Sequence, residues 1–169
     1  KKQVFFQDNF LEKYRLVREI SQLQIYALEL LNVVDKFCHE HEIPYYLGEG
    51  SMLGAVRHHG FIPWDDDIDL LMERQYYDKF IALAVKDFPD GYALDCMETN
   101  PRHWTICAKI QITRNTPFLQ KKVQGIGLYA GPNIDIFPLD QVPRESSVVQ
   151  TCQGFIVDVL KVMLWIKTG

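Results

Sequence analysis

The stretch that decides the fold is Pro63-Trp64-Asp65-Asp66-Asp67-Ile68-Asp69-Leu70. Side chains alternate between the two faces of a strand, so Asp67 and Asp69 would project from one face while Ile68 and Leu70 enter the core. Two carboxylates held side by side repel each other unless a cation lies between them. Oxygen ligands at this spacing suit Mg²⁺ or Mn²⁺. We therefore predict a divalent-metal site on a strand spanning residues 67–72.

The pattern says less about the two preceding carboxylates, Asp65 and Asp66. An acidic run is often a solvated loop, but here Trp64 and Ile68 interleave with the carboxylates, as in a half-buried strand. Asp65 is two residues before Asp67, so on an extended chain it would face the same side. It is a candidate for a further metal ligand or for a residue that contacts the ligands. Asp66 is expected to face away and to have a structural role.

Upstream, the sequence Gly48-Glu49-Gly50-Ser51 follows a short strand expected at residues 45–47. Glycine lets the backbone approach a phosphate closely, and the start of a helix presents free N–H groups to an anion. We expect Ser51 to cap a short helix that runs to about His58 and is ended by Gly60. A Gly-Ser pair alone is as often a plain helix cap as a phosphate site, and the later Asp-x-Asp pattern is what favours the second interpretation.

The remaining periodicities predict a mixture of helices and strands. Helical spacing of apolar residues favours helices at 12–41, 74–88 and 147–167, and further strands are expected at 92–96, 105–112 and 133–137. The last of these strands carries Asp135 between apolar residues. Residues 120–132 contain three glycines and are expected to form a loop or hairpin. The fold class is therefore α/β (α+β), with a mixed sheet flanked by helices.

Bulk properties set limits on the function. The 169 residues suffice for a single domain over residues 1–169 with a real core, and we expect the protein to continue beyond Gly169. A net charge of −4 argues against nucleic-acid partners. No uncharged run approaches the roughly 20 residues of a transmembrane segment. The four cysteines form no CxxC pair, which disfavours a zinc site and is typical of reduced thiols in a cytoplasmic protein.

Three separated blocks resemble one known family: residues 47–58, residues 62–69 and residues 134–140. The order of strand, Gly-Ser, helix and Asp-x-Asp strand, with a third carboxylate from a later strand, is similar to the nucleotidyltransferase superfamily. The amino-acid sequences of the three blocks resemble the LicD branch of this superfamily, which includes the fukutin-related proteins. This resemblance runs from about Tyr26 to Asp140, and it is much more specific for the family than for a donor or an acceptor.

The resemblance implies an activity. Bacterial members move phosphocholine from CDP-choline onto a sugar of a surface glycan such as a teichoic acid or lipopolysaccharide, and fukutin-related members move ribitol phosphate. It thus implies a Mg²⁺- or Mn²⁺-dependent transferase that takes CDP-choline or a similar CDP-linked donor and a glycan acceptor. The expected location is cytoplasmic, at the inner face of the membrane, and the helix expected at 147–167 is a candidate to pack on missing sequence, on another subunit or on a membrane surface.

The resemblance also implies site residues. The metal-binding and catalytic carboxylates would be Asp67, Asp69 and Asp135. Asp135 would also be the candidate general base. Residues that line the phosphate site or neutralise phosphate charge are Gly50, Ser51, Arg57 and Lys109. For Arg57 and Lys109 the alternative is a pair with a local carboxylate.

Other interpretations stay open at this point. A true nucleotidyltransferase that places NMP on a small molecule would use the same carboxylates. A non-catalytic glycan- or nucleotide-binding module is a third interpretation. Tyr45, Tyr46 and Trp64 are candidates to stack on a base or on choline, or simply to pack, and His103 is expected at the surface.

Overall fold

The computed structural model describes residues 2–103, 105–114 and 132–141, without the side chains of residues 2–19. The helices and strands within these ranges lie in the first of two compact units, Lys1–Leu139. In chain order they are α1 (Lys2–Glu40), β1 (Tyr46–Leu47), α2 (Glu49–His58), β2 (Ile68–Glu73), α3 (Arg74–Asp87), β3 (Tyr92–Asp95), β4 (Ala108–Ile112) and β5 (Asn133–Leu139). A single domain over residues 1–169 stays a prediction, because most of the second unit lies outside these ranges.

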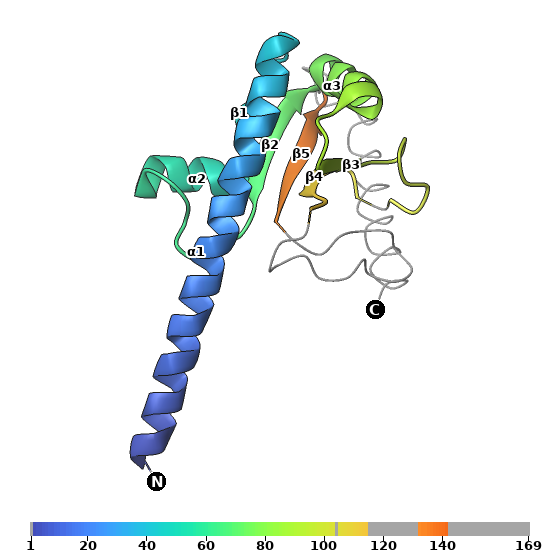
Figure 1. Cartoon of the computed structure of the whole chain (residues 1–169). Coiled ribbons are helices and arrows are strands. Elements are labelled where there is room, and N and C mark those ends of the chain that lie inside the picture. The colour runs from blue at the N-terminus through green and yellow to red at the C-terminus, as the bar shows by residue number, and fades with distance from the viewer. Residues whose placement is uncertain (1, 104, 115–131, 142–169) are drawn as a thin grey trace, which may run out of the picture. The chain divides into compact units, whose positions relative to one another are not determined.

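The five strands form one mixed sheet with the order β1-β2-β5-β4-β3 (Figure 1). The central strands β2 and β5 are parallel, whereas β1–β2, β5–β4 and β4–β3 are antiparallel pairs. The predicted class, a mixed α/β sheet flanked by helices, is therefore confirmed. Strands β2 and β5 are far apart in sequence, and their pairing brings the Asp-x-Asp segment beside the strand that carries Asp135.

One face of the sheet is apolar and covered by helices. Alternate residues of β2, β4 and β5 are buried in one cluster with side chains of α1 and α3. Phe37 of α1 and Phe80 of α3 meet within this cluster with ring centroids 5.5 Å apart, so both helices pack on the same face. Because side chains alternate along a strand, the residues between these core positions project from the opposite face of the sheet.

The ends of α2 differ from the prediction. The helix begins at Glu49 with Gly48 as its N-cap, and Met52 N–H donates to the Gly48 carbonyl at 2.8 Å. Ser51 is therefore inside the helix, so its predicted role as N-cap is wrong. At the other end His59, with φ of 55°, takes the left-handed C-cap position expected of Gly60.

Other boundaries shift by a few residues or cannot be compared. Strand β4 begins at Ala108, because Thr105 turns its hydroxyl back onto the Cys107 carbonyl at 3.0 Å instead of extending the ladder. The helix expected at 147–167 and nearly all of the loop expected at 120–132 lie outside the described ranges.

Three cysteines are buried free thiols, as predicted: Cys38, Cys96 and Cys107. Within the described residues, no helix combines the length and apolar character that a membrane span needs.

Candidate functional site

The polar face of the sheet carries a row of charged residues across three neighbouring strands. Asp69 on β2 pairs with Asp135 on β5, and Asp135 pairs in turn with Lys109 on β4. Directly paired residues project from the same face of a sheet. Asp67 directly precedes β2 and interacts electrostatically with Asp135 and Lys109. The fold thus places all three predicted carboxylates and the predicted lysine on one side of the sheet.

Asp135 is the most tightly held member of this row. Lys109 Nζ lies 2.6 Å from its Oδ1 and 2.5 Å from its Oδ2. Asn133 Nδ2 donates to Oδ1 at 2.7 Å, and the Cys107 thiol donates to Oδ2 at 3.6 Å. Asp135 is 9% exposed, so its charge is compensated within the protein and not by water. Lys109 therefore does pair with a local carboxylate, and that carboxylate belongs to the site.

The other two carboxylates, Asp67 and Asp69, have raised pKa values. Partial burial, followed by repulsion from Asp67 and Asp135, raises the pKa of Asp69 from 3.8 to about 6. Burial, followed by repulsion from Asp65 and Asp66, raises the pKa of Asp67 as well. Raised carboxyl pKa values mean that the site favours an added positive charge, either a proton or a cation.

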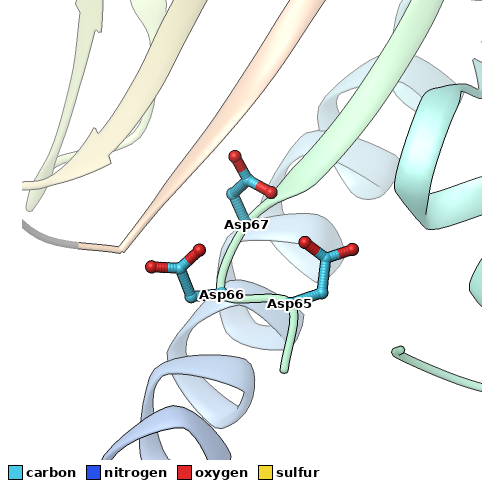
Figure 2. Close-up of side chains that lie close together, drawn as sticks. All are labelled: Asp65, Asp66 and Asp67. Carbon is cyan, nitrogen blue, oxygen red and sulfur yellow. The ribbon is translucent and has the colours of Figure 1, made fainter. Parts of the chain in front are cut away.

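The loop before β2 brings further carboxylates to this position. One ligand oxygen each from Asp65, Asp66 and Asp67 lies within 4.8 Å of the others, and Figure 2 shows the three side chains extending from the same side of the loop. The expectation that Asp66 faces away is therefore wrong. The predicted ligand set Asp67, Asp69 and Asp135 is not as closely grouped, and the metal-binding roles of its members stay predictions.

The start of α2 is joined to β2 at Asp69. The backbone N–H of Asp69 donates to Ser51 Oγ at 2.9 Å, and Gly48 N–H donates to the Asp69 carbonyl at 2.9 Å. A Cβ atom on Gly50 would lie 2.7 Å from Asp65 Oδ2. Gly50 thus leaves no room for a side chain beside Asp65, and Ser51 contacts Asp69 directly. The roles of both residues toward phosphate stay predictions.

Among the predicted site residues, Arg57 has the weakest structural link to the acidic segment. It is exposed in the last turn of α2, about 9 Å of helix rise beyond Ser51. Its role toward phosphate stays a prediction. Trp64 is 73% exposed and Tyr46 is 53% exposed, whereas Tyr45 is half-buried and donates to Asp35 Oδ1 at 2.7 Å.

The structure adds a buried histidine that the sequence did not reveal. The side chain of His103 is 3% exposed, with Nδ1 2.9 Å from Asp95 Oδ2 and Nε2 2.8 Å from the Cys107 carbonyl. The expectation of a surface histidine is wrong, because this pair ties the segment before β4 to the end of β3. Cys107 in turn contacts Asp135, so the cluster braces the third carboxylate. His103 lies in an irregular segment, where no periodicity signals burial.

Gln24 on α1 is a second residue missed. Its Nε2 donates to the Ile62 carbonyl at 3.2 Å and to the Asp65 carbonyl at 2.8 Å, across 38 and 41 residues of sequence. A signal for it does exist. Gln24 lies one turn before Ala27 and two before Leu31, so it flanks the apolar stripe of the helix.

A mixed sheet in which a Gly-Ser helix start meets an Asp-x-Asp strand, with a third carboxylate on the neighbouring strand, is the arrangement of a nucleotidyltransferase-like domain. The chain belongs to the family described as LicD/FKTN/FKRP, nucleotidyltransferase domain, whose profile matches residues 42–145. The predicted family is thereby confirmed.

A relative of named function agrees with this assignment. The chain is 33% identical over 131 residues to the lipopolysaccharide cholinephosphotransferase LicD of Haemophilus influenzae. The aligned region covers 77% of this chain and 48% of that protein. The chain thus spans about half the length of this relative. Over 67 residues it is 36% identical to an uncharacterized protein of Rickettsia prowazekii and to one of Rickettsia typhi; the match covers 40% of this chain, and 24% and 21% of those proteins. No solved structure gives a significant match.

Proposed function

We propose that this chain is the catalytic part of a metal-dependent transferase that moves phosphocholine, or a related substituted phosphate, from a CDP-linked donor to a sugar hydroxyl of a cell-surface glycan. The family and the Haemophilus influenzae relative, a lipopolysaccharide cholinephosphotransferase, support the transferred group and the type of acceptor. CDP-choline as the donor, Mg²⁺ or Mn²⁺ as the cofactor and a location at the inner face of the membrane are parts of this proposal.

The observation that carries the proposal is the pairing of Asp69 with Asp135 across the parallel strands β2 and β5. It brings together two carboxylates that are 66 positions apart in the sequence, with Asp67 on the same face. Because their charges repel, this arrangement is costly without a cation. The same strand is joined through Ser51 to the start of α2, where anions bind well.

The residues present fit a divalent cation. Their donor atoms are carboxylate oxygens, the ligands that Mg²⁺ and Mn²⁺ prefer, and burial, followed by repulsion from Asp67 and Asp135, raises the pKa of Asp69. Asp67, Asp69 and Asp135 would hold the ion, with Asp65 as a further candidate ligand. Asp135 already accepts from Lys109 on both oxygens, from Asn133 on Oδ1 and from Cys107 on Oδ2, so it would bind a cation in place of one of these donors. When bound, the ion supplies charge stabilisation on the phosphate oxygens.

The protein's own groups would then position the reactants. Backbone N–H groups near Gly50 and Ser51 would hold phosphate oxygens, and Lys109 would offset negative charge on the β4 side of the row. Asp135 would accept the proton of the attacking sugar hydroxyl. The hydroxyl oxygen would form its bond to the phosphorus that carries the choline, in line with the leaving CMP. Rate acceleration would come mainly from positioning and charge neutralisation.

The test is release of CMP from CDP-choline by the whole chain with Mg²⁺ and a lipopolysaccharide acceptor, alongside a titration of CDP-choline binding. Asp67→Asn should lower CMP release by on the order of 100-fold or more. The matched control is Asp78→Asn, at an exposed aspartate of α3 paired only loosely with Arg74 at 3.6 Å. Pyrophosphate release from NTPs would instead indicate nucleotidyl transfer. Metal-independent binding of CDP-choline, unaffected by Asp67→Asn, would indicate a binding module.

A further inference from the structure

We propose that Gln24 is a positioning residue, which fixes the backbone of the loop that carries Asp65, Asp66 and Asp67 and so holds Asp67 where it can bind a divalent cation together with Asp69 and Asp135. The inference rests on the proposed metal site. Gln24 belongs to α1 and lies outside residues 42–145, the part of the chain that the family profile matches.

The contact is made to both ends of one tight turn. Asp65 N–H donates to the Ile62 carbonyl at 3.0 Å, which closes the turn Ile62-Pro63-Trp64-Asp65, with Pro63 at the position where proline is favoured. Gln24 then donates to the Ile62 carbonyl at 3.2 Å and to the Asp65 carbonyl at 2.8 Å. Both partners can only accept, so the group that faces them must be the amide NH₂, which has two protons to donate.

The chemistry of this contact suits a cation site. The three carboxylates that follow the turn have oxygens within 4.8 Å of one another, and their mutual repulsion favours spreading the loop apart. Gln24 opposes that spreading through the main chain. Because it is uncharged and binds carbonyl oxygens, it leaves the carboxylate oxygens available and adds no cation of its own. Lys109, by contrast, binds a carboxylate directly.

Residues behind metal ligands commonly change metal affinity by 10–100-fold when they are replaced. Gln24 lies outside the buried apolar cluster, so its replacement should leave the core intact. A purely structural role would lower the melting temperature without a specific effect on metal binding. A positioning role predicts the reverse, weaker binding of metal in a protein that stays folded.

The experiment is a titration of the whole chain with Mn²⁺ alone, in which free Mn²⁺ is followed by electron paramagnetic resonance. The variants are Gln24→Met, similar in length without donors, and Gln24→Asn, which keeps the amide but is one methylene too short to reach both carbonyls. Gln22→Met is the control, at an exposed glutamine of the same helix. Hydrogen exchange at the Asp65 amide reports the turn itself.

The proposal expects Gln24→Met to raise the Kd for Mn²⁺ about tenfold and Gln24→Asn to raise it less. The Asp65 amide should exchange faster in both variants, and Gln22→Met should behave like the wild type. An unchanged Kd in the Gln24 variants, while Asp67→Asn abolishes binding, would overturn the role of Gln24 alone. Loss of the folded circular-dichroism spectrum in both Gln24 variants would overturn it too. Wild-type Mn²⁺ binding by Asp67→Asn would instead refute the proposed metal site.

Discussion

Lys109 and Asp135 form an ion pair on adjacent strands, with the Lys109 ammonium 2.6 and 2.5 Å from the two oxygens of the carboxylate. Their side chains are 19% and 13% exposed. Neighbouring Asp69 adds negative charge on the other side of Asp135. Lys109 is therefore the cation that balances the charge of the third carboxylate where water has little access.

Replacing Lys109 with Met should leave that carboxylate buried and unpaired. Breaking a buried pair typically costs about 3–5 kcal/mol, and the residual exposure of this pair lowers the expected loss of unfolding free energy to about 2–3 kcal/mol in metal-free buffer. Urea denaturation measures it. The double change Lys109→Met with Asp135→Asn should recover at least half of the loss. A double variant as unstable as the single one would contradict the pairing argument.

The raised pKa of Asp69 predicts an unusual pH dependence of the unfolding free energy. Its folded pKa of about 6 lies above the ordinary value of 3.8, so the folded state binds this proton more tightly than the unfolded state. Stability from this group is present at low pH and is lost as pH rises from about 4 to about 6. Asp69→Asn should therefore stabilise the metal-free protein at pH 7.5 by about 1 kcal/mol, after discounting for half-exposure.

That gain should shrink as the pH falls from 6 to 4, and saturating Mg²⁺ should reverse it, because the variant lacks a ligand. Thermal melts of wild type, Asp69→Asn and the exposed control Asp78→Asn at several pH values are the measurement. A stabilisation that is constant from pH 4 to pH 8 would show that burial and repulsion of the Asp69 charge are not its cause.

Gly50 offers a steric test of the helix start. An added Cβ would lie 2.7 Å from Asp65 Oδ2, whereas a Cβ on Gly60 would meet nothing within 4 Å. Since a carboxylate can rotate away, Gly50→Ala should cost little stability but displace Asp65 and weaken Mn²⁺ binding by several-fold. Gly60→Ala should leave binding unchanged and alter unfolding free energy by less than about 1 kcal/mol. Equal Mn²⁺ affinities in the two variants would show that Asp65 does not contribute.

Ser51 supplies a test of the joint between α2 and β2. Its hydroxyl accepts the Asp69 N–H at 2.9 Å, and Ser51→Ala leaves that partly buried donor without its partner. The expected loss is about 1–2 kcal/mol in urea denaturation. Ser51→Thr, which keeps the oxygen, should retain most of the stability. If alanine and threonine variants are equally unstable, the hydrogen bond is not the cause.

Strand periodicity placed Asp67 and Asp69 on one face and Asp135 on a later strand, because alternation along a strand is a local property. Sequence could not show that Lys109 would take both oxygens of Asp135, since cross-strand register depends on the whole sheet. It likewise missed the partners of His103 and Gln24, which act across irregular segments. The predicted N-cap of α2 was wrong by three residues, because the Ser51 hydroxyl accepts the Asp69 N–H of β2 instead of capping the helix.

The central claim is that Asp67, Asp69 and Asp135 converge on one divalent cation. Its most direct test is a crystal of the whole chain soaked with Mn²⁺ and CDP-choline, with anomalous diffraction recorded at the manganese edge. The account predicts an anomalous peak bound by oxygens of all three carboxylates, beside the donor diphosphate and the start of α2. A peak held by Asp65, Asp66 and Asp67 without Asp135, or a bound donor with no peak at all, would contradict it.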